Sequence, residues 1–348
     1  MEDANKQNEQ TNNSDKEQLQ NEVNPNLAFT NRIDLSELQE GIEAIRIELH
    51  KVIIGQKGMI DLLIATILSS GHSLIEGVPG VAKTITAKLI AKTMKVDFSR
   101  IQFTPDIMPS DILGTSIFNM KTSEFEFKSG PIFSNIVLID EINRAPAKTQ
   151  AALFEVMEEK QVTIDGKTYK MEAPFLVFAT QNPIEQEGTY RLPEAQLDRF
   201  LFKIEVEYPT LEEEIEIIET HHNRKETNKT DVVKGILTAS QVAKFQKQVQ
   251  EILIEKHLIN YIAKIVTNTR ENPFLYLGAS PRASLAILQA SKAFAAMQGR
   301  DFVTPDDIKR SAIPVLQHRV IVTPEREMEG VTSKQVINQM LETIEIPR

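Results

Sequence analysis

The chain has 348 residues, of which 41% are hydrophobic and 25% are charged, and it carries a net charge of −10 with no cysteine. This length allows two domains of ordinary soluble composition, and the acidic balance argues against a surface built mainly to bind phosphate backbones. The absence of cysteine excludes disulfides, thiolate metal sites and a cysteine nucleophile.

The beginning of the chain is polar. Residues 1–33 are rich in Asn, Gln, Glu, Asp and Lys and show almost no apolar periodicity. Such a segment cannot bury enough surface to offset the entropy lost on ordering, so we predict a disordered tail. Helical spacing begins at Leu35 and continues through Leu38, Ile42 and Ile45.

Residues 34–208 alternate short apolar runs with helical stretches, which is typical of a parallel sheet covered on both faces. The candidate strands are residues 72–76, 100–103, 135–139, 174–180 and 200–205. Residues 160–170 differ, because Asp165-Gly166 between two alternating segments predicts a β-hairpin. We therefore predict an α/β fold, an αβα sandwich around a five-stranded parallel sheet.

Helical patterns fill the chain after Pro209. Thr210 and Thr238 each begin a capping box, and Ser280 and Thr304 each precede a proline at a first helical position. Residues 209–348 are accordingly predicted to form a second, smaller all-α domain that acts as a lid.

A phosphate-binding loop lies between the first candidate strand and a helix. Backbone N–H groups of such a loop wrap phosphates, while its lysine reaches the β- and γ-phosphates and its hydroxyl binds Mg²⁺. An alanine replaces the usual second glycine, so the motif alone is only suggestive of ATP. The predicted nucleotide-binding residues are Gly77, Val78, Pro79, Gly80, Val81, Ala82, Lys83 and Thr84.

Two adjacent carboxylates follow the apolar strand at 135–139. Charges at the end of a buried strand are costly unless they are paired, and a bound cation would pair them. We predict that Asp140 holds Mg²⁺ together with Thr84, and that Glu141 is the general base for an attacking water. The alternative, ordinary solvated acids, is disfavoured by the phosphate loop upstream.

Three further polar residues have two interpretations each. Asn182 ends the next strand and would orient the water, or it forms a turn before Pro183. Arg199 would reach a neighbouring subunit's γ-phosphate, or it makes an exposed ion pair. Arg282 begins a lid helix and would report nucleotide occupancy, or it is a surface arginine.

Taken together, the motifs resemble the MoxR family of AAA+ ATPases from about residue 52 to 318. The most specific matches are Ile-Gln-Phe-Thr-Pro-Asp at 101–106, Asp-Glu-Ile-Asn-Arg-Ala-Pro at 140–146, Leu-Pro-Glu-Ala-Gln-Leu-Asp-Arg-Phe at 192–200 and Gly-Ala-Ser-Pro-Arg at 278–282. The resemblance makes the alanine of the loop a usual family residue. It also implies an insertion at 104–131 and a hairpin at 160–170 that precedes sensor 1.

Roles for single residues come from the same resemblance. It implies that Ile54 and Gln56 pack around the adenine and that Asn182 is sensor 1. It also implies that Arg199 is the arginine finger and Arg282 is sensor 2. Arg191 stands where proline is frequent and could share or take the role of the finger.

Assembly and purpose are likewise implied by the resemblance. It implies a homo-oligomer, usually a hexameric ring, that remodels, matures or activates client protein complexes, with partners that carry von Willebrand factor A domains. The alternatives are a nucleic-acid motor, with Lys160, Lys167 and Lys170 lining a pore, and a slow nucleotide-gated scaffold. The acidic chain makes nucleic acid the less favoured partner. Without a signal pattern or an apolar span, we expect a cytoplasmic protein.

Overall fold

The computed structural model describes residues 32–183, 189–223 and 231–346. The tail predicted for residues 1–33 therefore lies almost wholly outside the described residues. The boundaries predicted at 33/34 and 208/209 stay predictions.

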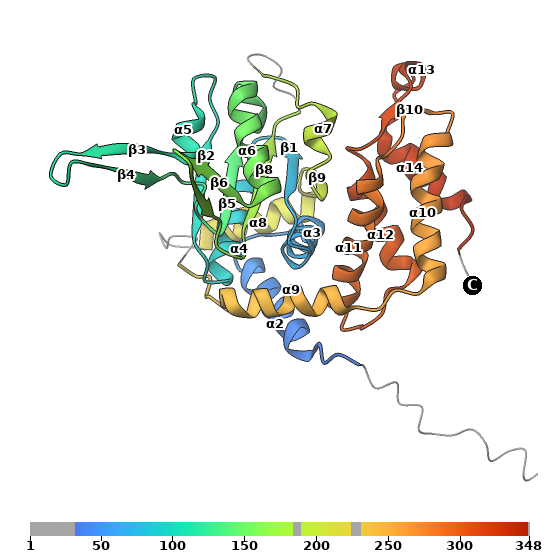
Figure 1. Ribbon diagram of the computed structural model, residues 1–348. Coiled ribbons are helices and arrows are strands. Elements are labelled where there is room, and N and C mark those ends of the chain that lie inside the picture. Colours follow the sequence, from blue (N-terminus) through green and yellow to red (C-terminus); the bar gives the residue numbers. More distant parts are fainter. Residues whose placement is uncertain (1–31, 184–188, 224–230, 347–348) are drawn as a thin grey trace, which may run out of the picture. The chain divides into compact units, whose positions relative to one another are not determined.

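A five-stranded parallel sheet has the strand order β2–β5–β8–β1–β9 (Figure 1). Within this sheet, strands that follow one another along the chain are joined by long crossover connections, as parallel pairing requires. The five predicted strands are confirmed, each within two residues of its expected bounds. They are β1 Ser73–Gly77, β2 Phe98–Gln102, β5 Ile136–Asp140, β8 Leu176–Gln181 and β9 Phe202–Val206.

The register brings the carboxyl ends of the strands to one edge of the sheet. Gln102 of β2 pairs with Asp140 of β5, and Glu76 of β1 pairs with Gln181 of β8. Residues that follow different strands are thereby gathered at this edge, which is where ligands bind in open parallel sheets.

Helices cover the sheet, and their apolar faces pack against its apolar faces to form one core (Figure 1). The Phe154 and Phe200 rings meet edge to face in this core, 5.7 Å between centroids, and both are fully buried. The helices of this part are α2 Ser36–His50, α3 Lys57–Leu68, α4 Lys83–Thr93, α5 Pro109–Leu113, α6 Ala147–Glu159 and α7 Glu194–Leu197, with a short 3₁₀ turn, η1, at Ile142–Arg144. The next helix, α8 Leu211–Asn223, begins after the predicted boundary at 208/209, and none of its residues is buried.

The hairpin predicted at 160–170 is confirmed. Its strands are β6 Gln161–Ile164 and β7 Lys167–Lys170. Asp165 and Gly166 both have positive φ, 50° and 76°, as a tight two-residue turn demands.

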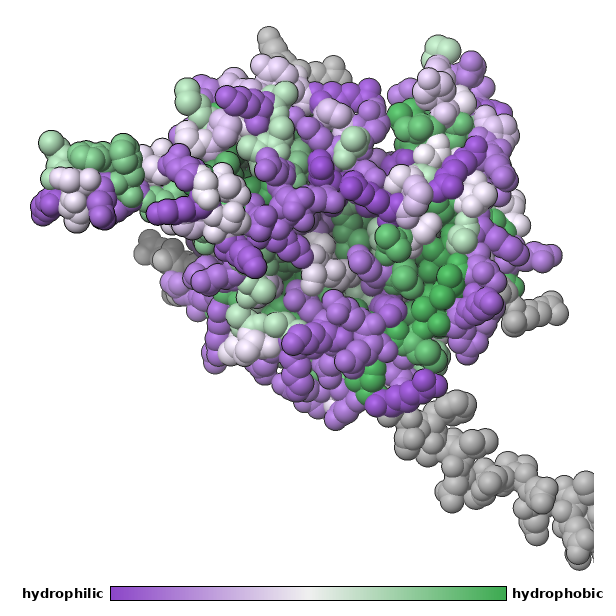
Figure 2. Space-filling model, in the orientation of Figure 1, coloured by the Kyte–Doolittle hydropathy of each residue, from purple (hydrophilic) through white to green (hydrophobic). Residues whose placement is uncertain are grey.

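A second hairpin, β3 Gly114–Asn119 with β4 Glu124–Ser129, projects away from the sheet (Figure 1). It lies within the insertion that the resemblance placed at 104–131, although the strands themselves were not predicted. Its tip exposes apolar side chains, visible as a green patch in Figure 2, with Phe118 49%, Phe125 72% and Met120 87% exposed.

The lid is helical, with one exception. Its helices are α9 Ala239–Glu251, α10 Lys256–Glu271, α11 Pro281–Met297, α12 Pro305–Leu316, α13 Pro324–Met328 and α14 Ser333–Thr343. Between them β10 Leu275–Leu277 pairs with β11 Ile321–Val322, so the expectation of helix throughout is wrong at this point. Strands of two or three residues are too short to show a period of two. Among the described residues, none of the helices is both long and apolar enough to cross a membrane.

Candidate active site

The predicted phosphate loop joins β1 to α4 at the edge where the strands end. At Gly77 a Cβ would lie 2.8 Å from the carbonyl oxygen of Val206, so β1 and β9 approach too closely there for any side chain. Gly80 has φ 92°, and Ala82 has φ 61° in the left-handed region. The usual glycine of the motif adopts that conformation without strain, whereas an alanine there costs about 1–2 kcal/mol.

A pocket of about 360 Å³ lies over this loop. Eight of its twelve lining residues were predicted for ATP, Mg²⁺ or catalysis, and the lining comes from four separate segments of the chain. Its lining consists of Pro79, Gly80, Ala82, Lys83, Thr84, Ile85, Arg100, Gln102, Asp140, Glu141, Thr180 and Asn182.

Asp140 is buried at the base of the pocket and faces oxygen and nitrogen donors. The Thr180 hydroxyl donates to its Oδ1 at 3.0 Å, and the Thr84 hydroxyl lies 3.4 Å from Oδ2. Because Mg²⁺ prefers oxygen ligands, the paired hydroxyl and carboxylate fit the predicted ion. Arg100 occupies the remaining side, with Nε 2.5 Å from Oδ2.

Lys83 extends along the loop, and its ammonium donates to the carbonyl oxygen of Gly77. Partial burial lowers the pKa of Lys83, while the nearby carboxylates of Asp140, Glu141 and Glu76 oppose that shift. A triphosphate in the pocket would add negative charge beside the ammonium and favour its protonated form.

Glu141 directly follows β5 and adopts φ 59°, which turns the chain into η1. Its backbone N–H donates to the Thr180 hydroxyl at 3.1 Å. The carboxylate accepts from Gln102 Nε2 at 2.9 Å and pairs with Arg144 Nε at 2.8 Å. The general base predicted from sequence is therefore held by a fixed set of donors.

Arg100 and Gln102 were not predicted as site residues. They lie two apart on β2, so they share one face of the strand. Arg100 Nη2 also donates to Gln102 Oε1 at 3.2 Å, and the two side chains connect Asp140 with Glu141. The sequence held a signal for them: both are polar and lie at or near the carboxyl end of β2, the strand that pairs with β5, so they reach the same edge of the sheet as Asp140.

The two predicted arginines lie together, away from this pocket. Arg199 Nε is 3.1 Å from Glu158 Oε2, and Arg282 Nη2 is 3.2 Å from Glu158 Oε1. Neither arginine lines the phosphate pocket of its own chain. Arg191 is 85% exposed and lies 3.9 Å from Glu194.

The residues predicted around the adenine lie outside the lining of the phosphate pocket. Gln56 has φ 52°, precedes α3, and donates through Nε2 to the carbonyl oxygen of Glu207 at 3.1 Å. Ile54 is half-buried in the same segment. Their role at the adenine stays a prediction.

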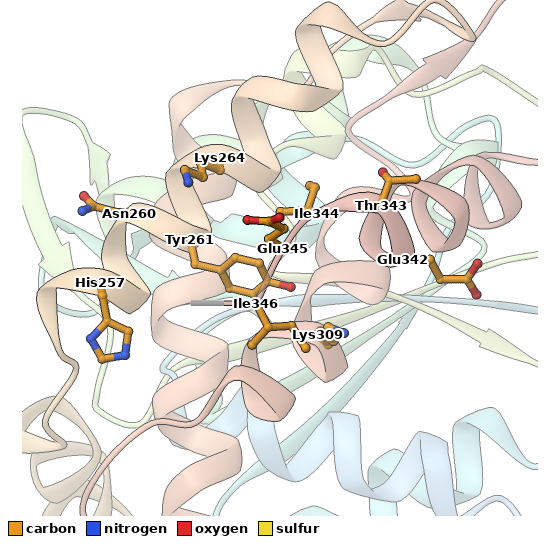
Figure 3. A pocket seen from close by; sticks show the side chains of 10 residues that line it. All are labelled: His257, Asn260, Tyr261, Lys264, Lys309, Glu342, Thr343, Ile344, Glu345 and Ile346. Atoms are coloured by element: carbon orange, nitrogen blue, oxygen red, sulfur yellow. The ribbon is translucent and has the colours of Figure 1, made fainter. Parts of the chain in front are cut away.

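A larger pocket, about 700 Å³, lies in the lid between α10, α12 and the end of α14 (Figure 3). Lys264 and Lys309 line it together with Glu342 and Glu345, so its charges are balanced. The Tyr261 hydroxyl is buried and has no hydrogen-bond partner among the described residues. None of the residues predicted for catalysis or nucleotide binding lines this pocket.

Two family models match the chain. The model of the ATPase family associated with various cellular activities (AAA) matches residues 72–202, which contain the phosphate loop, the two acids and four of the five strands of the sheet, and end at the first residue of β9. The AAA lid domain matches residues 267–340. The class is therefore an AAA+ ATPase, an enzyme that hydrolyses ATP.

Similar proteins narrow the class. The chain is 43% identical over 316 residues to Chaperone MoxR1 of Mycobacterium tuberculosis, covering 88% of this chain and 82% of that protein. It is also 43% identical over 299 residues to YeaC of Bacillus subtilis, covering 86% and 92%. A crystal structure from Cytophaga hutchinsonii superposes with a TM-score of 0.83 at 44% identity, covering 90% of this chain and 97% of that one. The chain belongs to the MoxR family of AAA+ ATPases.

Proposed function

We propose that this ATPase works as a hexameric ring in which each ATP lies between two subunits. The observation that carries this proposal is the position of Arg199 and Arg282. Both arginines share one carboxylate, Glu158, outside the phosphate pocket of their own chain. Arginines that stabilise a transferring phosphoryl group must reach it, and a neighbouring subunit's pocket provides one to reach.

Within one site, different residues bind the phosphates, hold the metal ion and activate the attacking water. The loop N–H groups and Lys83 bind the phosphates, while Thr84 and Asp140 hold Mg²⁺. When bound, Mg²⁺ neutralises charge on the β- and γ-phosphate oxygens. Glu141 accepts a proton from the attacking water, and Asn182, which lines the same pocket, orients that water.

The shared site is tested by mixing two inactive variants. Glu141→Gln lacks the base but offers an intact arginine, and Arg199→Ala has an intact pocket but no finger. Each alone should lose about 10³-fold or more in ATP turnover, since fingers contribute 10³–10⁵ in related enzymes. The mixture of the two variants should regain ATP turnover. Arg191→Ala alone should keep the turnover of the wild type. An inactive mixture, or full activity in Arg199→Ala, contradicts the assignment.

We further propose that hydrolysis remodels or matures client proteins rather than moves nucleic acid. The exposed Phe118 and Phe125 rings of the β3–β4 hairpin, 5.2 Å apart, support a protein partner. Apolar aromatic side chains at an exposed tip are common where proteins bind each other. The net charge of −10 disfavours a phosphate backbone.

The client proposal is tested by co-purification with a tagged Glu141→Gln protein, a trap that binds ATP but hydrolyses it too slowly to release its client. The same trap with Phe118→Ser and Phe125→Ser is the matched control, since both changes lie on exposed rings far from the pocket. Proteins captured by the first and absent from the second support client binding at the hairpin. ATPase activity stimulated by DNA and strongly reduced by salt would instead favour the nucleic-acid motor. A turnover that stays very low at saturating protein concentration would favour the nucleotide-gated scaffold.

Two further parts of the proposal do not come from the structure. A partner with a von Willebrand factor A domain is implied by the family resemblance, and a cytoplasmic location is the expectation from the sequence. Co-purification of the tagged trap with such a partner from the cytoplasmic fraction tests both.

A further inference from the structure

Arg319 follows α12 and is buried with every donor satisfied. Its Nε donates to Asp198 Oδ1 at 2.7 Å. Its Nη2 donates to the carbonyl oxygens of Asp198 and Phe200 at 3.0 and 2.6 Å. Its Nη1 donates to those of Leu201 at 3.1 Å and Val315 at 2.5 Å. An arginine has five N–H donors, and here four of them bind the core segment 198–201.

The same segment carries the predicted finger. Asp198 precedes Arg199, and its second carboxylate oxygen accepts from the Ser280 hydroxyl at 2.9 Å. Ser280 is the N-cap of α11 and accepts from the backbone N–H of Arg282 at 3.2 Å. One carboxylate thus joins the segments that carry both arginines, and Arg319 fixes that carboxylate from the lid.

The geometry of this network is stiff. Because the guanidinium of Arg319 is planar, its bonds to the segment 198–201 fix the direction as well as the distance of that backbone. A shift of the segment would leave a buried donor or acceptor unpaired, which is costly. Arg199 and Arg282 both pair with Glu158, each through a different oxygen of its carboxylate.

We propose that Arg319 is a positioning residue for the shared ATP site. It fixes the positions of Arg199 and Arg282 relative to each other. Because Arg319 belongs to the lid, the position of the lid then determines the position of the arginine finger. This inference rests on the proposed function, because it concerns the arginines offered to the neighbouring subunit. Arg319 does not line the phosphate pocket, and it acts through Asp198. Movement of the lid in one subunit is thereby transmitted to hydrolysis in the next.

The test begins with Arg319→Lys, which keeps the charge but loses the planar fork. We expect kcat to fall about 100-fold, since a misplacement of about 1 Å can cost that much. KM for ATP and the affinity for a fluorescent ATP analogue should stay within twofold of the wild type, because the pocket of the same chain is intact. Arg300→Lys is the matched control, since Arg300 pairs with Asp307 at 2.8 Å wholly within the lid, and it should keep kcat.

Mixing experiments separate positioning from a general loss of structure. A subunit with Arg319→Lys should behave as defective only on its finger side. It should regain activity with Glu141→Gln, which supplies a finger, and remain inactive with Arg199→Ala, which supplies none. A loosened fold would weaken both mixtures alike. If Arg319→Lys does not fold, Asp198→Asn replaces it, with the same pattern expected.

The outcomes are separable. Restored activity in both mixtures, in neither, or an unchanged kcat in Arg319→Lys overturns the positioning role. If Glu141→Gln mixed with Arg199→Ala stays inactive, the shared site itself is wrong, whatever Arg319 does. A finger-side defect with unchanged nucleotide affinity supports the inference.

Discussion

Acid should destabilise this protein through His72, a buried residue just before β1. Its Nδ1 accepts from the backbone N–H of Val177 at 2.9 Å, and its Nε2 donates to the carbonyl oxygen of Met157 at 3.1 Å. Both bonds belong to the neutral ring, and burial lowers the pKa of His72 from 6.5 to about 4. Its contribution is therefore fully present above pH 6.5 and is lost as the pH falls toward 4, because the unfolded chain takes up the proton first.

The magnitude follows from that pKa. At about 1.4 kcal/mol per pH unit, the loss between pH 6.5 and 4 amounts to about 3 kcal/mol, a large part of a typical folding free energy. Burial also holds the pKa of His318 well below its usual value, so that residue adds a change of the same sign.

Urea unfolding between pH 7 and 4.5 measures this change. His72→Gln should unfold with a free energy whose slope against pH is smaller than that of the wild type by about 1.4 kcal/mol per pH unit. Val177→Ala is the matched control, because it removes buried volume beside the ring without removing a titrating group. It should lower stability at every pH and keep the wild-type slope. Equal slopes in His72→Gln and the wild type would refute the reasoning.

Three further predictions concern the site. Gly77→Ala should lower the free energy of unfolding by about 1–3 kcal/mol in urea, because its Cβ would meet the carbonyl oxygen of Val206; unchanged stability would contradict that close approach. Thr180→Val should lower kcat about 10-fold with little effect on the fold, since it removes the donor to Asp140 and the acceptor for the N–H of Glu141. Removal of Mg²⁺ by EDTA should stop phosphate release and added Mg²⁺ should restore it; hydrolysis that persists in EDTA would exclude the assigned metal role.

The sheet and most of the pocket could be predicted from the sequence because their signals are local. A fully apolar strand, a loop of fixed spacing and two acids after a strand are each read within ten residues. Parallel pairing then brings the ends together by a general rule, so Lys83, Asp140 and Asn182 reach one pocket as expected.

The missed features depend on long-range pairing. Arg100 is an exposed arginine on an edge strand until the register places it against Asp140. Glu158 is one of several acids near the end of α6, and only the packing of the lid shows that two arginines share it. Arg319 binds mostly backbone carbonyls more than 110 residues away, and carbonyls have no side-chain signature.

The left-handed backbone of Glu141 has a consequence for the stability of the protein as a whole. A residue with a Cβ costs about 1–2 kcal/mol in that conformation, while asparagine adopts it more readily. For the backbone conformation alone, asparagine is thus the better residue at this position, although it would remove the carboxylate that pairs with Arg144 and is the proposed base. The proposed base thus occupies a backbone conformation that lowers the free energy of unfolding, so the site draws on the stability of the fold that holds it.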